Sequence, residues 1–141
     1  MANRLKRGIF LVFADLDGMK KINDTLGHKE GDSALIDIAN ILKKTFRESD
    51  IIARIGGDEF AVLAVETHDV SIEVFITRLK SNLEAHNVEE LHHYKLSLSL
   101  GFSCYDPDNP CSIEKLLALA DTNMYEQKRK KQKDTSFTFN Q

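Results

Sequence analysis

Residues 51–65 read IIARIGGDEFAVLAV and contain a glycine turn between two apolar runs. The runs Ile51–Ile55 and Phe60–Val65 are short and rich in β-forming residues, and Gly56-Gly57-Asp58-Glu59 separates them. Two such runs around a glycine turn are typical of a β-hairpin. The stretch therefore predicts two antiparallel strands with two acidic side chains at the tip of their connection.

The segments on either side of this hairpin predict further strands and helices. Residues 8–14 form a short, continuously apolar run, which indicates a strand buried on both faces. Residues 96–102 alternate between large apolar and small residues, which indicates a half-buried strand. A short polar helix is predicted at 20–25 and ends at Gly27. Amphipathic spacing predicts three further helices: one capped by Asp32 or Ser33 and reaching 46, one at 72–83, and one at 113–124, capped by Ser112.

A last alternating segment, residues 135–139, is predicted to be a strand, which gives the order βααββαβαβ. Helices with apolar stripes need a sheet to cover. We therefore expect an α/β fold of the α+β sandwich type, in which helices cover a central mixed, mainly antiparallel sheet.

Composition and charge narrow the classes of protein. The 141 residues fit one domain, and 42% hydrophobic and 29% charged residues are ordinary for a globular fold. A net charge of −3 does not favour a nucleic-acid partner. No apolar run is long enough to insert into a membrane, and Cys104 and Cys111 do not form a metal-binding pair. We expect one cytoplasmic domain over residues 1–141, with its core at about 8–139; membrane attachment of a parent protein stays open.

Two carboxylates in separate segments predict a metal site. Asp15 follows the first buried strand and Asp58 lies in the hairpin turn. Carboxylates without histidine or cysteine suit Mg²⁺, to which the Leu16 carbonyl could be a further ligand. Gly56 and Gly57 lack Cβ atoms, so they tolerate positive φ and allow phosphate oxygens to approach the backbone. Each feature also has a simpler explanation: an ordinary turn at the glycines, a helix N-cap at Asp17, and an exposed turn residue at Glu59.

Four blocks of the sequence together resemble one known family. The run RIGGDEF at 54–60 resembles the GGDEF family, the diguanylate cyclases. The resemblance extends to FADLDGMKKIND at 13–24, LGHKEGD at 26–32 and ADTNMYEQK at 120–128. The blocks occur in the family's order and cover roughly residues 8–139. The family fold is similar to the nucleotide cyclase and polymerase palm folds, which is consistent with the predicted sandwich.

The resemblance implies a role for each matching position. It implies that Mg²⁺, or Mn²⁺ in its place, binds to Asp15, Asp58, Glu59 and the carbonyl of Leu16, and that Asp58 and Glu59 are catalytic. It also implies that guanine binds to Asn23 and Asp32, and that phosphates bind to Lys20, Lys128, Gly56 and Gly57. Without the resemblance, the two lysines would be read as surface charges, Asn23 as a helix C-terminal residue and Asp32 as an N-cap.

The implied reaction joins two GTP molecules into cyclic di-GMP and releases two pyrophosphates. One GTP per subunit would require a homodimer. Arg47-Glu48-Ser49-Asp50 matches the family's RxxD inhibitory product site, and Arg78 lies where a secondary arginine of that site is found. The simpler explanation of the tetrapeptide is a helix-terminal arginine followed by a loop aspartate.

The sequence departs from the family in two places. The DxLTxLxNR segment and the helix that precede the first strand are not recognisable here, so we expect a domain lacking the family's N-terminal helix. Lys131-Gln132 stands where the family more often has glycine followed by lysine or arginine, and Lys133 could replace the lost phosphate contact. Two alternatives therefore stay open: a non-catalytic GGDEF domain that binds GTP or cyclic di-GMP as a regulatory module, and a different nucleotide cyclase or polymerase-like palm.

Overall fold

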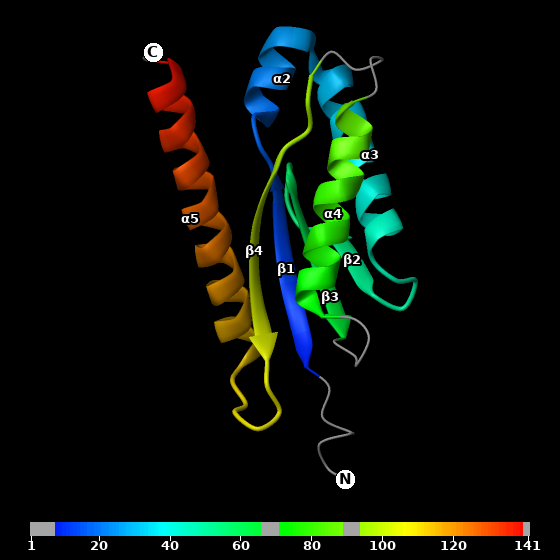
Figure 1. Cartoon of the computed structure of the whole chain (residues 1–141), viewed down its shortest axis with the longest axis vertical. Helices are drawn as coiled ribbons and strands as arrows, with labels where there is room; N and C mark the ends of the chain where they lie inside the picture. Colours follow the sequence, from blue (N-terminus) through cyan, green and yellow to red (C-terminus); the bar gives the residue numbers. More distant parts are fainter. Residues whose placement is uncertain (1–7, 66–70, 89–93, 140–141) are drawn as a thin grey trace.

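The computed structural model describes residues 8–65, 71–88 and 94–139, with side chains up to residue 131. Its elements follow the order βααββαβα (Figure 1). They are β1 (Ile9–Leu16), α2 (Met19–Leu26), α3 (His28–Thr45), β2 (Ile51–Arg54), β3 (Glu59–Val65), α4 (Ile72–Asn87), β4 (Leu98–Tyr105) and α5 (Ile113–Phe139).

The strands form one sheet in the order β2-β3-β1-β4. All three pairings between these strands are antiparallel. Phe13 of β1 lies opposite Ala61 of β3 and Gly101 of β4, which fixes the register of the central strands. Helices α3 and α4 lie on one side of the sheet and α5 on the other (Figure 1). The predicted sandwich is confirmed.

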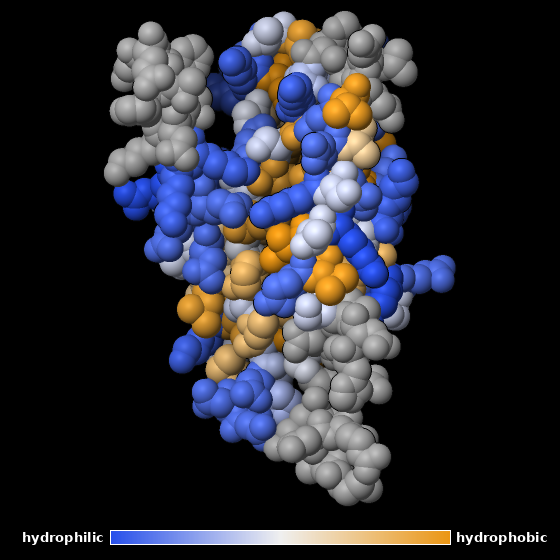
Figure 2. Space-filling view, in the orientation of Figure 1, coloured by the Kyte–Doolittle hydropathy of each residue, from blue (hydrophilic) through white to orange (hydrophobic). Residues whose placement is uncertain are grey.

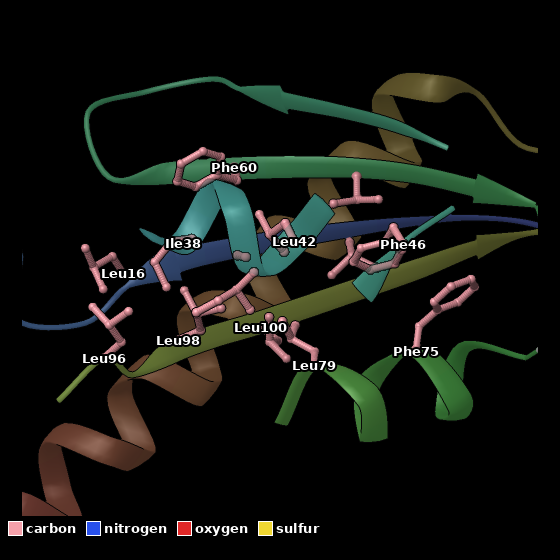
Figure 3. Packing of buried hydrophobic residues seen from close by; sticks show 14 of the residues in the cluster. Leu16, Ile38, Leu42, Phe46, Phe60, Phe75, Leu79, Leu96, Leu98 and Leu100 are labelled. Carbon is pink, nitrogen blue, oxygen red and sulfur yellow. The ribbon is translucent and has the colours of Figure 1, made fainter. Parts of the chain in front are cut away.

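The larger core lies between the sheet and helices α3 and α4. Alternate residues of each strand point to this side, because side chains alternate between the faces of a strand. Figure 3 shows side chains of the strands and of both helices directed toward one another in this layer. The cluster includes Phe10 and Leu16 of β1, Ile38 and Leu42 of α3, and Phe75 of α4. It holds the exit of β1 rigidly in place.

The smaller core lies between the sheet and α5. Leu11 and Phe13 of β1 pack here against Ala120 and Met124 of the helix. Gly101 of β4 allows the helix to come close, because a Cβ at this position would lie 2.1 Å from the Ala120 carbonyl oxygen. The coverage by α5 explains why β4 is buried on both faces over Leu98–Gly101 instead of half-buried as predicted.

Two sequence predictions about helix ends are wrong. Helix α3 begins at His28 rather than after an Asp32 or Ser33 cap, because Gly27 adopts a φ of 94° and lets α3 start directly after α2. Residues 135–139 belong to α5 and not to a strand. No glycine or proline interrupts residues 113–139, so nothing ends the helix, and a five-residue alternation is a weak strand signal.

Candidate functional site

The two acidic segments converge at the end of β1. Asp15 pairs with Glu59 across the β1–β3 ladder. The backbone N–H of Leu16 donates a hydrogen bond of 2.9 Å to the carbonyl oxygen of Asp58. Oδ1 of Asp15 is buried and has no hydrogen-bond partner among the described residues. The fold thus brings together Asp15, Leu16, Asp58 and Glu59, as a shared site requires.

Burial and neighbouring negative charge raise the pKa values of Asp15 and Glu59. Burial raises the pKa of Asp15, and the neighbouring Asp58 raises it further, while Lys128 opposes both effects. Burial also raises the pKa of Glu59, together with the charges of Asp15 and Asp121. Carboxylates that repel one another in a desolvated place form a site that a cation would stabilise.

Lys128 of α5 is the cation that the structure places beside Asp15. Its Nζ donates a hydrogen bond of 2.8 Å to Oδ2 of Asp15. Burial lowers the pKa of Lys128, but the hydrogen bond and charge of Asp15 outweigh it and raise this pKa overall. The predicted phosphate lysine is therefore part of the acidic site in the ligand-free chain.

The donor set fits a magnesium ion that shares its shell with a ligand. No group of three or more histidine, cysteine, aspartate or glutamate side chains is arranged to hold a metal in the part of the chain that the structure describes. Mg²⁺ commonly takes one or two carboxylates and completes its shell with water and substrate phosphates. Asp15 and Asp58 could supply such carboxylates, and Oδ1 of Asp15, which has no hydrogen-bond partner among the described residues, is an available oxygen donor.

The hairpin tip is open, and neither the backbone conformation nor close packing within the chain requires glycine at positions 56 and 57. Among the described residues, positive φ occurs at Gly18 and Gly27 and not at Gly56 or Gly57, so these two do not use the freedom expected of them. A Cβ on Gly57 would meet no described atom within 4 Å, and one on Gly56 would meet the Glu59 Cβ at 3.8 Å. The tip therefore leaves room for another molecule to approach its backbone.

Arg54 organises this tip, a role that the sequence did not reveal. Its Nε donates to the Gly56 carbonyl at 3.1 Å, and its Nη2 donates to the Gly57 carbonyl at 2.7 Å. The signal in the sequence was the position of Arg54: a long, charged side chain only two residues before the glycine turn can fold back over it.

The predicted guanine contacts lie around the junction of α2 and α3. Oδ1 of Asn23 is buried without a hydrogen-bond partner among the described residues. A Cβ on Gly31 would lie 1.9 Å from this oxygen, so Asn23 packs directly against the residue before Asp32. Asp32 is exposed at a cleft of about 600 Å³ that Arg54 and Phe60 also line. Lys20 is exposed in the first turn of α2.

The three residues of the predicted product site form one cluster. The Arg47 guanidinium donates two hydrogen bonds to the Asp50 carboxylate, from Nε to Oδ2 at 3.3 Å and from Nη2 to Oδ1 at 3.1 Å. It also donates to the Val65 carbonyl. The Cζ atoms of Arg47 and Arg78 lie 5.3 Å and 5.9 Å from the centre of the Phe75 ring. Val65 and Glu59 are at opposite ends of β3, which places this cluster about 20 Å from the acidic site.

Asp17 is bound in a way that the sequence did not predict. It is not a helix N-cap, because Gly18 occupies that position and no side chain caps α2. Its carboxylate accepts hydrogen bonds from Ser97 at 2.8 Å, Ser99 at 2.6 Å and Lys131 at 2.9 Å. In the sequence, Ser97 and Ser99 alternate with leucines, and this alternation indicated that both serines lie on the same side of the chain. Lys133 lies outside the described side chains.

Among the described residues, no helix is both long enough and apolar enough to span a membrane.

Comparisons with known proteins agree with this arrangement. Residues 1–134 match the family model described as diguanylate cyclase, GGDEF domain. The chain is 32% identical over 134 residues to diguanylate cyclase DgcP of Escherichia coli, covering 94% of the chain and 39% of DgcP. It is 34% identical over 122 residues to cyclic di-GMP phosphodiesterase NbdA of Pseudomonas aeruginosa, covering 86% of the chain and 16% of NbdA. The chain thus spans well under half of these relatives.

A solved structure with a similar fold is the GGDEF domain of DgcB from Caulobacter crescentus in complex with c-di-GMP. The two share 25% sequence identity with a TM-score of 0.73, over 87% of this chain and 73% of that one. The family model spans the hairpin, the acidic pair and the region around Arg47 together. The chain therefore belongs to the GGDEF domain family.

Proposed function

We propose that this domain is a diguanylate cyclase, which condenses two GTP molecules into cyclic di-GMP with release of two pyrophosphates. The observation that carries the proposal is the convergence of Asp15 and Asp58, with a buried and unpaired carboxylate oxygen, beside an open glycine hairpin. The name of the relative DgcP supports the reaction class.

The acidic groups would hold the metal and move the proton. Asp15, Asp58, Glu59 and the Leu16 carbonyl would bind Mg²⁺, or Mn²⁺ in its place. The bound ion would neutralise negative charge on the triphosphate and on the departing pyrophosphate. Asp58 would accept the proton of the 3′-hydroxyl that attacks the α-phosphate.

The remaining contacts would orient GTP. The backbone of Gly56 and Gly57 has no Cβ to keep phosphate oxygens away, and Lys20 and Lys128 would supply positive charge. Asn23 has an unpaired amide oxygen and Asp32 an exposed carboxylate, and both can accept the N–H donors of guanine. One domain places one GTP, so ring closure needs a second, symmetry-related domain in a homodimer.

Arg47, Asp50 and Arg78 would bind cyclic di-GMP as an inhibitor. Two arginines that lie over one aromatic ring present planar groups to stack on guanine and fork to phosphate, and Asp50 holds the Arg47 guanidinium in place. The GGDEF domain of DgcB, solved with c-di-GMP, shows that a domain of this fold binds that compound.

The second candidate function is a non-catalytic domain that binds GTP or cyclic di-GMP. The relative NbdA favours it, since this chain matches part of a protein that is named a phosphodiesterase. The convergence of Asp15 and Asp58 favours the cyclase instead, because its reaction needs both ligands for a metal and a carboxylate to accept a proton at this place.

One assay separates the two candidates. The chain is incubated with GTP and Mg²⁺ at high protein concentration, and cyclic di-GMP and pyrophosphate are measured. The Asp58→Asn variant is the test of mechanism, and Asp24→Asn, an exposed aspartate of α2, is a matched control. We expect product from the parent chain and the control and at least a hundredfold loss in Asp58→Asn. GTP binding without turnover in the parent chain would support the binding module.

A further inference from the structure

Helix α5 is attached to the edge of the sheet by a row of polar side chains. Asn123 donates to the Phe102 carbonyl, Gln127 accepts from the Leu100 N–H, and Lys131 donates to the Leu98 carbonyl. The three residues are spaced by four, so they lie on one face of the helix. They bind backbone groups of β4, which among the described residues is the last strand in the order β2-β3-β1-β4. In Figure 2 the hydrophilic surface of α5 borders an apolar band over β4.

Lys131 ends this row and also reaches the turn after β1. Its Nζ lies 2.9 Å from Oδ2 of Asp17 and 3.2 Å from Oγ of Ser97. Asp17 is held further by Ser97 and by Ser99, which is fully buried. The Asp17 N–H donates to the Ser97 carbonyl at 2.8 Å. One ammonium group therefore joins α5, the start of β4 and the turn that follows Asp15.

Two lysines of α5 face two aspartates at the exit of β1. Lys128 and Lys131 are three residues apart, and three residues make about one helical turn. Asp15 lies in β1, and Asp17 lies in the turn that directly follows the strand. Lys128 binds Asp15 and Lys131 binds Asp17, so two parallel ion pairs fix one segment against the other. The second pair limits how the Asp15 and Leu16 region can move.

We propose that Lys131 is a positioning residue for the metal-binding turn: through Asp17 it holds Asp15 and the Leu16 carbonyl in the orientation that a divalent cation needs. The inference rests on the proposed function, since the metal belongs to it. Partners that orient metal ligands contribute roughly tenfold to a hundredfold to metal affinity.

A direct contact between Lys131 and a substrate phosphate is the competing explanation. It differs in what happens without nucleotide. A contact to a substrate phosphate exists only when GTP is bound. Under this explanation, a change at Lys131 would leave the affinity for the metal alone intact. A positioning role weakens binding of the metal alone, because the ligands themselves are then less well ordered.

The test is a titration of the chain with Mn²⁺ alone, followed by electron paramagnetic resonance of the free ion. Lys131→Met keeps the aliphatic stem and removes the donors. Lys131→Arg restores a charged donor, and Lys130→Met, an exposed lysine of the same helix, is the matched control. We expect the dissociation constant for Mn²⁺ to rise about tenfold in Lys131→Met, to stay close to the parent value in Lys131→Arg, and to be unchanged in Lys130→Met.

Each outcome of these titrations supports or overturns the positioning role. Unchanged Mn²⁺ affinity in Lys131→Met with weakened GTP binding overturns the positioning role and leaves the proposed function standing. A parent chain that binds no Mn²⁺ overturns both. If Lys131→Met fails to fold by circular dichroism, Ser97→Ala decides, because it removes one hydrogen bond from Asp17 and one from Lys131 at an exposed position. Weaker Mn²⁺ binding in Ser97→Ala supports the proposal, and parent-like binding overturns it.

Discussion

Substituting Gly101 by alanine should push α5 away from the sheet and destabilise the fold. The added Cβ would lie 2.1 Å from the Ala120 carbonyl oxygen and 2.2 Å from the Met124 nitrogen, both of which are backbone atoms. Ordinary contacts of this kind are near 3.5 Å, so the helix has to move by more than 1 Å. The φ of Gly101 is not positive, so the backbone conformation itself accepts alanine. The whole cost therefore comes from overpacking, about 2–3 kcal/mol.

Urea unfolding followed by circular dichroism measures this cost. We expect Gly101→Ala to lower the midpoint at an unchanged slope, and to lower the melting temperature by roughly 5–10 °C. Gly57→Ala is the matched control, because its Cβ would meet no described atom within 4 Å. It should keep the parent stability while weakening GTP binding. An unfolding midpoint of Gly101→Ala equal to that of the parent would refute the close approach of α5 to β4.

Two further perturbations test the electrostatics of the two sites. Because the pKa of Asp15 is raised in the folded chain, the folded state binds this proton more tightly than the unfolded state does. The stability that this difference contributes is complete below the ordinary pKa of 3.8, and it is lost as the pH rises through the raised pKa. Asp15→Asn should therefore gain stability relative to the parent as the pH is raised over that window, and parallel urea midpoints at all pH values would contradict this. Calorimetry with cyclic di-GMP should show binding by the parent chain that the double change Arg47→Ala and Asp50→Ala abolishes and Arg78→Ala weakens. The double change avoids a buried unpaired carboxylate, since the Asp50 side chain is only 2% exposed, and unaltered affinity would reject the product site.

The strands and most helices were predictable because their patterns are local. The apolar run at 8–14 and the two runs around the glycine turn have the periods and lengths of strands, and the helix stripes have the period of helices. The errors occur where the pattern is short or its context is decisive. Residues 135–139 alternate, yet they continue a helix that no residue interrupts. The start of α3 depends on the backbone conformation of Gly27, which composition does not reveal.

The acidic site was predictable in its members but not in its supports. Asp15 and Asp58 stood out because they follow a buried strand and a glycine turn, and because their blocks resemble a family. Their roles stay predictions, whereas their proximity is a feature of the fold. The hydrogen bonds of Arg54, Ser99 and Lys131 join residues whose distances in space depend on sheet register and helix placement. Polar residues of this kind look like ordinary surface positions until the tertiary structure is known.

The separation of the two candidate sites restricts how product could inhibit the reaction. The clusters around Asp58 and Arg47 lie at opposite ends of β3, about 20 Å apart. Strand β3 is hydrogen-bonded on both sides, to β2 and to β1. A strand held in this way cannot slide without breaking two ladders, and its buried residues pack in the larger core. If product binds at Arg47 as proposed, it would not occupy the place proposed for GTP, and inhibition would have to act on how two domains meet rather than on the chemistry within one.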